Sequence, residues 1–181
     1  MHAGDARLLG QNLMDRENTP TAKVQRSLAA FELAAVGYRG RVRRQLNVGD
    51  EELTALLYLA HHGGVPQRRL AEITTLSRSG AGAMIQRLEQ DGFIERRTHP
   101  SDRRLRLVEL STAGRARVHD AYRDLTDATE RLLADSPEAD LEPLARLLDG
   151  LAGAAHAANG ENDEDPLSPP AEGDPIWRHW A

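Results

Sequence analysis

The stretch "SRSGAGAMIQRLEQDGFIERR", residues 77–97, decides the fold because its pattern changes from helical to extended near Gly92. The helical part has one apolar face, made of Ala81, Met84, Ile85 and Leu88. Ser77 is a good helix N-cap, and Gly92 is typical of a helix end. Residues 93–97 continue as a short strand. The stretch therefore predicts a helix between Ser77 and Gly92 that leads directly into a β-strand.

The patterns on both sides extend this unit into a mainly α fold with a small β-hairpin. A polar turn, "THPSD", joins the first strand to a second strand within residues 103–110. Further helices are predicted over residues 22–46, 50–62 and about 67–75, and after Ser111 and Ser136, with Pro66 and Pro137 in first-turn positions. Two short helices, a tight turn and a basic hairpin are typical of a winged helix-turn-helix. Its second helix enters the DNA major groove.

The composition places limits on the chemistry and location of the chain. It has 181 residues and no cysteine, which excludes disulfides, thiol catalysis and Cys-based zinc sites. No segment approaches 18 apolar residues, so we expect a cytoplasmic protein. No Gly-rich phosphate loop follows a strand and no ordered Ser/His/acid set occurs, so an enzyme is not predicted.

Charge is distributed unevenly along the chain, whose net charge is −5. Residues 66–106 hold nine Arg and five acids, which gives +4. Residues 159–181 hold one Arg and six acids, which gives −5, and we expect this Pro-rich tail to be disordered. A basic block inside an acidic chain indicates a surface that faces a specific partner.

The segment "LAEITTLSRSGAGAMIQRLEQDGFIERRTHPSDRRLRLVELSTAGR", residues 70–115, resembles the multiple antibiotic resistance regulator (MarR) family. Its specific parts are "RLEQDGFIERR", "SDRR" and "LSTAGR", and the resemblance covers roughly residues 22–155. It implies a homodimeric transcription regulator, usually a repressor and often released by a small ligand, with no cofactor. The implied organisation is a flexible arm (1–20), a helical dimerisation region (21–48 and 111–158), a DNA-binding lobe (49–110) and the tail (159–181).

The predicted DNA contacts begin at the N-terminus of the recognition helix, where backbone N–H groups favour phosphate. The candidates on this helix are Ser77, Arg78, Ser79, Gly80, Gly82, Gln86 and Arg87. Arg87 has two readings, a phosphate contact or a solvated helix charge. In the family the positions of Gly80 and Gly82 more often carry polar side chains. Here the glycines either allow close approach to DNA or avoid a clash inside the protein.

The predicted hairpin adds arginines at its tip and base. Resemblance to the family implies that Asp102 and one arginine brace the turn while the other arginine enters the minor groove. We assign Arg103 to DNA and Arg104 to the brace, although the opposite assignment stays open. Arg97 on the first strand is a candidate phosphate contact, and a merely solvated hairpin is the alternative.

The family also implies a small-molecule pocket, for an aromatic or phenolic ligand, between the dimerisation helices and the lobe. Its candidate residues are Tyr38, Arg39, Tyr58 and His62, where Arg39 suits a carboxylate and the tyrosines suit a core equally well. Histidines at 61, 62, 99 and 119 match no zinc motif, so no metal site is predicted.

A different class of function stays open beside DNA binding. The small side chains at residues 80–83 favour a winged-helix module that contacts proteins and has lost DNA binding. The nine arginines of residues 66–106 favour DNA instead. Replacing Arg78 and Arg103 separates the two hypotheses.

Overall fold

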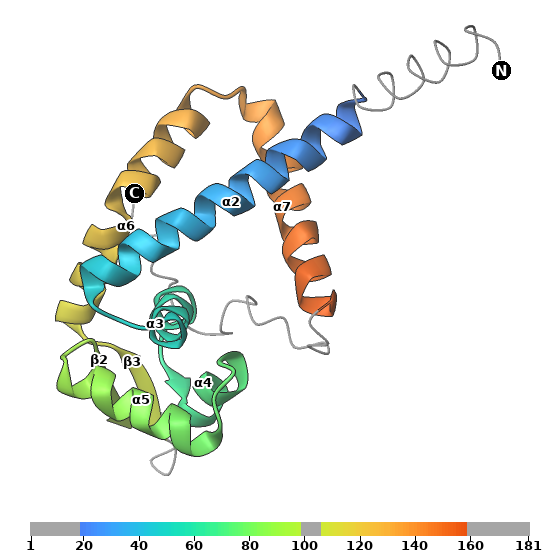
Figure 1. The fold of residues 1–181 in the computed structure, drawn as a ribbon. Coiled ribbons are helices and arrows are strands. Elements are labelled where there is room, and N and C mark those ends of the chain that lie inside the picture. The colour runs from blue at the N-terminus through green and yellow to red at the C-terminus, as the bar shows by residue number, and fades with distance from the viewer. Residues whose placement is uncertain (1–18, 99–105, 159–181) are drawn as a thin grey trace, which may run out of the picture. The chain divides into compact units, whose positions relative to one another are not determined.

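The computed structural model describes residues 19–98 and 106–158. The chain forms two compact units, Met1–Arg44 and Gln45–Ala181. The elements, which Figure 1 labels, follow the predicted order except for one additional strand. They are α2 (Pro20–Leu46), α3 (Asp50–His62), β1 (Val65–Pro66), α4 (Gln67–Ile73), α5 (Arg78–Gln90), β2 (Ile94–Thr98), β3 (Arg106–Leu110), α6 (Thr112–Ala134) and α7 (Glu138–Ala158). The predicted fold class, mainly α with a small β-sheet, is confirmed.

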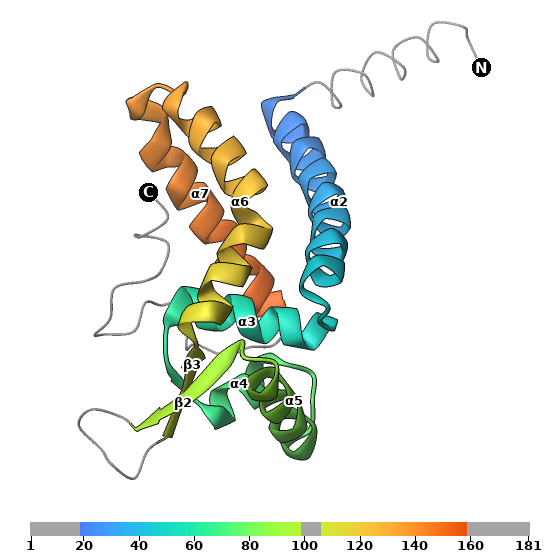
Figure 2. The same ribbon diagram turned by 90° about the vertical axis from the view of Figure 1, so that its left-hand side faces the viewer.

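The second unit contains a three-stranded antiparallel sheet with the order β1-β3-β2. Ile94 pairs with Leu110, and Val65 pairs with Val108 on the other side of β3. The expectation that Pro66 starts a helix was wrong by one residue. Pro66 has extended backbone angles, φ −60° and ψ 142°, so it ends β1 and caps α4. Figure 2 shows β2 and β3 side by side, close to the start of α6.

Helix α5 sits on the core through the apolar face that its spacing predicts. Ala81, Met84, Ile85 and Leu88 are all buried. They share the core with Leu53, Leu56 and Leu59 of α3, with Phe93 and Ile94, with Val108 and Leu110 of β3, and with Val118 and Ala121 of α6. The opposite face of α5 is left to solvent, which is the arrangement a reading helix needs.

The ends of α5 and the start of α6 also agree with the prediction. Ser77 Oγ accepts a hydrogen bond from Gly80 N at 3.2 Å, and Gly92 has a positive φ of 74°. Ser111 Oγ accepts from Gly114 N at 2.8 Å and donates to the Gly92 carbonyl at 2.6 Å. A Cβ at Gly114 would overlap the Phe93 carbonyl, so α6 starts directly against the backbone between α5 and β2.

Three long helices expose apolar side chains in the single chain. On α2 these are Val24, Phe31, Leu33 and Val36; on α6, Leu125, Leu132 and Leu133; on α7, Leu144, Leu147 and Leu148. Helix α7 begins at Glu138, one residue after the predicted first-turn position of Pro137. None of the helices in the described ranges is long and apolar enough to span a bilayer. Exposed leucines at helical spacing indicate surfaces that another helix covers.

Candidate nucleic-acid interface

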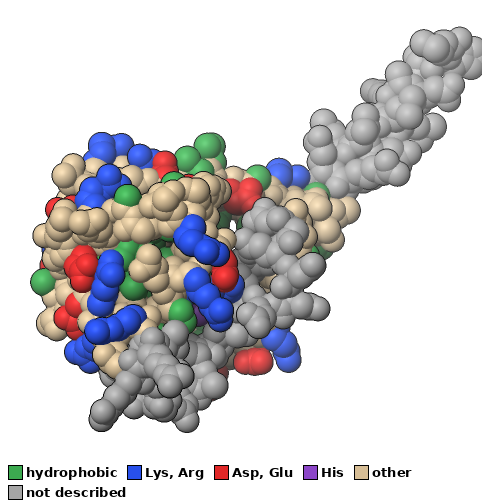
Figure 3. Space-filling view, turned by 90° about the horizontal axis from the view of Figure 1, so that it is seen from below, with side chains coloured by type: hydrophobic (Ala, Val, Ile, Leu, Met, Phe, Trp, Pro, Cys, Tyr) green, Lys and Arg blue, Asp and Glu red, His purple; other side chains and the backbone are tan. Residues whose placement is uncertain are grey.

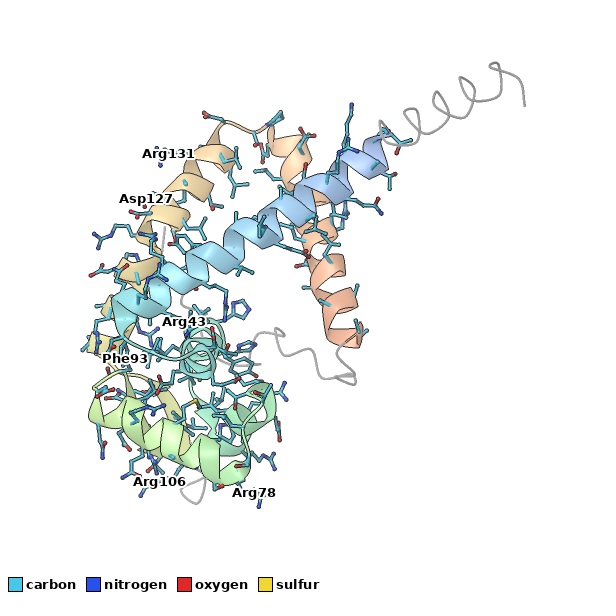
Figure 4. The ribbon with its side chains drawn as sticks, in the orientation of Figure 1. Arg43, Arg78, Phe93, Arg106, Asp127 and Arg131 are labelled. Carbon is cyan, nitrogen blue, oxygen red and sulfur yellow. The ribbon has the colours of Figure 1, made fainter. Side chains whose placement is uncertain are left out.

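The first turn of α5 presents its polar side chains to solvent. Ser77, Arg78 and Ser79 are all exposed, and Ser77 Oγ lies 3.1 Å from Ser79 Oγ. In Figure 4 the Arg78 and Arg106 side chains both lie at the lower surface of the lobe. The N-terminal end of a helix carries partial positive charge, which adds to that of Arg78. This end of α5 is therefore suited to a phosphate oxygen.

A groove of about 660 Å³ runs between α4 and the start of α5. One side is lined by Gln67, Arg68, Ala71 and Glu72 of α4, and the other by Leu76, Arg78 and Ala81. Arg68 is exposed, and the sequence analysis did not single it out. Lys and Arg side chains are spread across the face drawn in Figure 3, with acidic side chains between them. The groove brings Arg68 and Arg78 to a shared surface.

The glycines of α5 have room for a methyl group within the chain. A Cβ at Gly80 would lie 3.4 Å from Ser77 Oγ, and one at Gly82 would lie 3.7 Å from Gln67 Nε2. Both distances are ordinary van der Waals contacts. The interpretation that Gly80 and Gly82 avoid an internal clash is therefore wrong, and their role in approach to DNA stays a prediction.

The two candidates in the second half of α5 differ in their contacts. Gln86 is exposed, whereas Arg87 binds Glu52 of α3 through its Nε and Oε1 of the carboxylate. The Arg87 side chain still exposes 63% of its area. Arg87 is thus more than a solvated helix charge, because it links α5 to a buried acid while part of it faces solvent.

Arg97 of β2 pairs with two carboxylates of the hairpin. Its Nε lies 2.6 Å from Glu109 Oε1 and 3.1 Å from Glu95 Oε1. Burial raises the pKa of Glu109 above its ordinary value, and the positive charge of Arg97 opposes that rise. These contacts offer a structural role for Arg97 beside the predicted phosphate contact. Asp102, Arg103 and Arg104 lie outside the described residues.

Two of the predicted ligand residues lie together in the lobe. The rings of Tyr58 and His62 stack with centroids 3.9 Å apart, and Arg69 Nε donates to Tyr58 Oη at 2.9 Å. This hydrogen bond raises the pKa of Arg69 above its ordinary value. Tyr38 and Arg39 belong to α2 in the first unit, where Arg41 lies 4.7 Å from the Tyr38 ring centroid. Residues 19–98 and 106–158 contain no group of three metal-ligating side chains.

Four residues of this surface and of its supporting contacts were not predicted from the sequence. Arg68 and Arg106 are exposed cations, and the count of arginines in residues 66–106 was their only signal. Glu51 and Glu52 contact the turn before α5 and α5 itself. The spacing of Gly49 and Glu52 is that of a capping box, but no periodicity links Glu52 to Arg87, 35 residues later.

Comparisons with known proteins identify the family to which this architecture belongs. The model of the MarR family matches residues 46–105, from the end of α2 into the hairpin. The HTH-type transcriptional regulator YwhA of Bacillus subtilis, itself uncharacterized, is 32% identical over 96 residues, which are 51% of this chain and 69% of that protein. The chain belongs to the MarR family.

A further relative and a solved structure are also similar to this MarR-family chain. The HTH-type transcriptional regulator BilQ of Clostridium symbiosum is 29% identical over 53% of this chain and 67% of its own length. The matched segments thus span about two thirds of these two relatives. The crystal structure of a mutant MepR from a multidrug-resistant S. aureus isolate shares the fold. It has a TM-score of 0.56 and 16% identity, and the match covers 76% of this chain and 99% of that one.

Proposed function

We propose that this chain is a dimeric, sequence-specific DNA-binding transcription regulator of the MarR family. The observation that carries the proposal is the exposed Ser-Arg-Ser turn at the N-terminus of α5, beside the groove that Arg68 and Arg78 share. In this proposal α5 enters the major groove, and the hairpin, with Arg103 at its tip, contacts the adjacent minor groove. A cytoplasmic repressor without enzymatic activity fits this assignment.

The homodimer is supported by the exposed apolar side chains of α2, α6 and α7. Phe31 and Leu33 expose 62% and 77% of their area, and Leu147 and Leu148 expose 48% and 55%. A second copy that covers these faces removes them from water, which favours association. We infer that residues 21–48 and 111–158 form the dimerisation region. A dimer would read a pseudo-palindrome with half-sites about one helical turn apart.

Control by a small aromatic or phenolic ligand is part of the proposal. Tyr58 and His62 supply a stacked pair of rings in the lobe, and Arg69 adds a cation at the Tyr58 hydroxyl. Aromatic faces and a nearby guanidinium suit an aromatic acid. Tyr38 and Arg39 of α2 stay candidate ligand-binding residues.

The proposal is tested by selecting bound duplexes from a random DNA pool and measuring affinity over a range of salt concentrations. We expect a palindromic consensus and a steep loss of affinity with salt, because phosphate contacts release counterions. Repeating the measurement with aromatic acids tests ligand release. Absence of a consensus, or affinity independent of salt, would overturn DNA reading.

A protein-binding winged helix is the second candidate. The small side chains at residues 80–83 and the pairing of Arg87 and Arg97 with acids favour it, because they reduce the number of side chains available to bases. The two candidates differ in their response to Arg78→Ala. If the chain reads DNA, Arg78→Ala should bind the duplex more weakly than the wild type. If the chain is a protein-binding module, the activity of Arg78→Ala should be unchanged.

A further inference from the structure

Two adjacent acids in the first turn of α3 reach toward α5. Glu51 accepts two hydrogen bonds from Thr75, one from its Oγ1 at 2.7 Å and one from its backbone N at 3.2 Å. Thr75 lies in the turn between α4 and α5, two residues before the cap residue Ser77. Glu51 therefore holds the chain just before the recognition helix begins.

Glu52 makes a second connection, farther along the same helix. Its Oε2 accepts from Gly49 N at 2.7 Å, which caps the N-terminus of α3, and its Oε1 accepts from Arg87 Nε. Glu52 is buried, whereas the Arg87 side chain exposes 63% of its area. One carboxylate oxygen of Glu52 is enough to cap α3. The capping role therefore does not account for the contact between the other oxygen and α5.

The two contacts hold α5 at both ends. Thr75 precedes its first turn, and Arg87 lies in its last turn, so α3 carries both anchors in neighbouring residues. A buried carboxylate also restricts the guanidinium it binds, because the hydrogen bond at Nε fixes one point of the planar group. The exposed part of Arg87 then has fewer orientations, and less rotamer entropy is lost when it binds a phosphate.

The position of α5 matters more for DNA recognition than the position of a helix rich in polar side chains would. Residues 80–83 are Gly, Ala, Gly and Ala, so the middle of α5 carries no group that hydrogen-bonds a base. Recognition by such a helix depends on where its backbone and its few cationic side chains lie. A small rotation of α5 would misplace Arg87, and residues 80–83 carry no polar side chain that could replace its contact.

We propose that Glu52 is a positioning residue for DNA recognition: it orients Arg87 toward a DNA phosphate and, together with Glu51, holds α5 in its reading position. The proposal rests on the DNA-binding function proposed above. Arg87 makes the contact with DNA, and Glu52 acts through Arg87 without touching the duplex.

A double-mutant cycle tests this assignment on the selected duplex. Four full-length proteins are compared: wild type, Glu52→Gln, Arg87→Gln and the double variant. Gln retains an acceptor for Gly49 N but loses the charge that holds Arg87. We expect each single variant to bind about 5- to 10-fold more weakly and to lower the salt slope by about one. The double variant should bind no more weakly than Arg87→Gln, because both changes remove the same contact.

Glu89→Gln is the matched control, since Glu89 lies on the same helix and pairs with Arg96 at 3.2 Å instead of Arg87. It should leave the affinity and the salt slope unchanged. A purely structural role for Glu52 would lower the melting temperature and leave the salt slope as it is. An unchanged slope in Glu52→Gln, or additive losses in the double variant, would overturn the positioning role.

A second variant covers the case in which Glu52→Gln does not fold. Arg87→Lys changes a solvent-facing side chain and keeps its charge, but it lacks the Nε that Glu52 binds. We expect it to bind about as weakly as Arg87→Gln, and affinity equal to wild type would overturn the proposal. Wild-type protein without sequence-dependent binding would instead overturn DNA reading itself, so the two failures are distinguishable.

Discussion

At the scale of single residues, the arginines of the lobe differ in what they contact. Arg87 and Arg97 bind carboxylates of other elements, whereas Arg68 and Arg78 line the groove beside α5. Arg97 is shared between two acids, so its guanidinium has less to gain from a phosphate than one at a helix N-terminus. Among the described residues we therefore assign phosphate contacts to Arg68 and Arg78, beside the contact proposed for Arg87.

Arg78→Ala should weaken binding to the selected duplex and reduce the salt slope by about one, since one phosphate contact is lost. Arg123→Ala is the control, because Arg123 is exposed on α6, away from the groove, where it pairs with Asp120. Both variants should unfold at the wild-type temperature. Equal duplex affinity for Arg78→Ala and Arg123→Ala would show that Arg78 does not contact the DNA.

Gly114→Ala should destabilise the lobe by about 3 kcal/mol or more, because the new methyl group overlaps the Phe93 carbonyl in a packed core. Gly150→Ala on α7 is the matched control. Its methyl group meets no atom within 4 Å, so helix propensity should stabilise it by up to about 1 kcal/mol. Urea unfolding of the two variants measures both effects, and similar midpoints would contradict the close approach at Gly114.

Sequence and structure agree on residues whose role is local. Ser77, Gly92 and Ser111 were predictable because a cap or a helix end depends on its own few neighbours. The partners of Arg87 and Arg97 were not predictable, since Glu52 and Glu109 belong to other elements and helical or strand spacing carries no information on them. The predicted direct DNA contacts at the wing stay predictions, because residues 99–105 lie outside the described ranges.

At the scale of elements, α5 combines a well-formed apolar face with a weak helical interior. Ala81 and Ile85 are buried as their spacing requires, yet Gly80 and Gly82 reduce helix stability without relieving a close contact in the chain. Contacts within the folded lobe therefore do not explain this loss of helix stability. Approach of the helix backbone to a partner is the explanation that the proposed function supplies.

Replacing both glycines with alanine should stabilise the lobe by roughly 1–2 kcal/mol through helix propensity. Duplex affinity should fall at the same time, since two methyl groups would hold the helix away from the groove. Chemical denaturation and a titration with the selected duplex measure the two effects separately. Unchanged affinity would rule out close approach as the reason for these glycines.

The sheet contains an acid, Glu109, whose titration should change the free energy of unfolding. Burial raises the pKa of Glu109 in the folded lobe above the ordinary value of 4.5, so the folded chain keeps a proton that the unfolded chain has released. The stability that this proton contributes is present at low pH and is lost as the pH rises through the raised value. Glu109→Gln removes the titration.

The unfolding free energy of the wild type, relative to Glu109→Gln, should therefore decrease between about pH 4 and neutral pH. Urea denaturation at several pH values measures this difference. Glu142→Gln, on the exposed face of α7, controls for the loss of a carboxylate outside the sheet. A constant difference between wild type and Glu109→Gln would mean that Arg97 fully offsets the effect of burial.

At the scale of the whole molecule, each unit exposes apolar helix surface. The most exposed large side chains are on α2 and α6, and three leucines of α7 are at least two-fifths exposed. The three long helices were predicted from the sequence, but the chain that covers their exposed apolar side chains could not be identified from it. Family resemblance supplied the homodimer, which stays part of the proposed function.

Changing Leu147 and Leu148 together to Asp should convert the dimer to a monomer, because the charges would be buried without partners at the interface. Arg146→Asp, which spacing places on the opposite face of α7, is the control and should stay dimeric. Sedimentation at several protein concentrations measures the change. A dimer in the double variant would exclude this face of α7 from the interface.

The two-residue strand β1 has a further consequence for how copies of this chain associate. It forms one edge of the sheet, and Pro66 has no N–H with which to pair another strand. Such an edge resists the strand-to-strand addition that leads to aggregation and domain swapping. Self-association of two copies through β1 is therefore disfavoured, which leaves β2 as the edge of this sheet where a strand could be added.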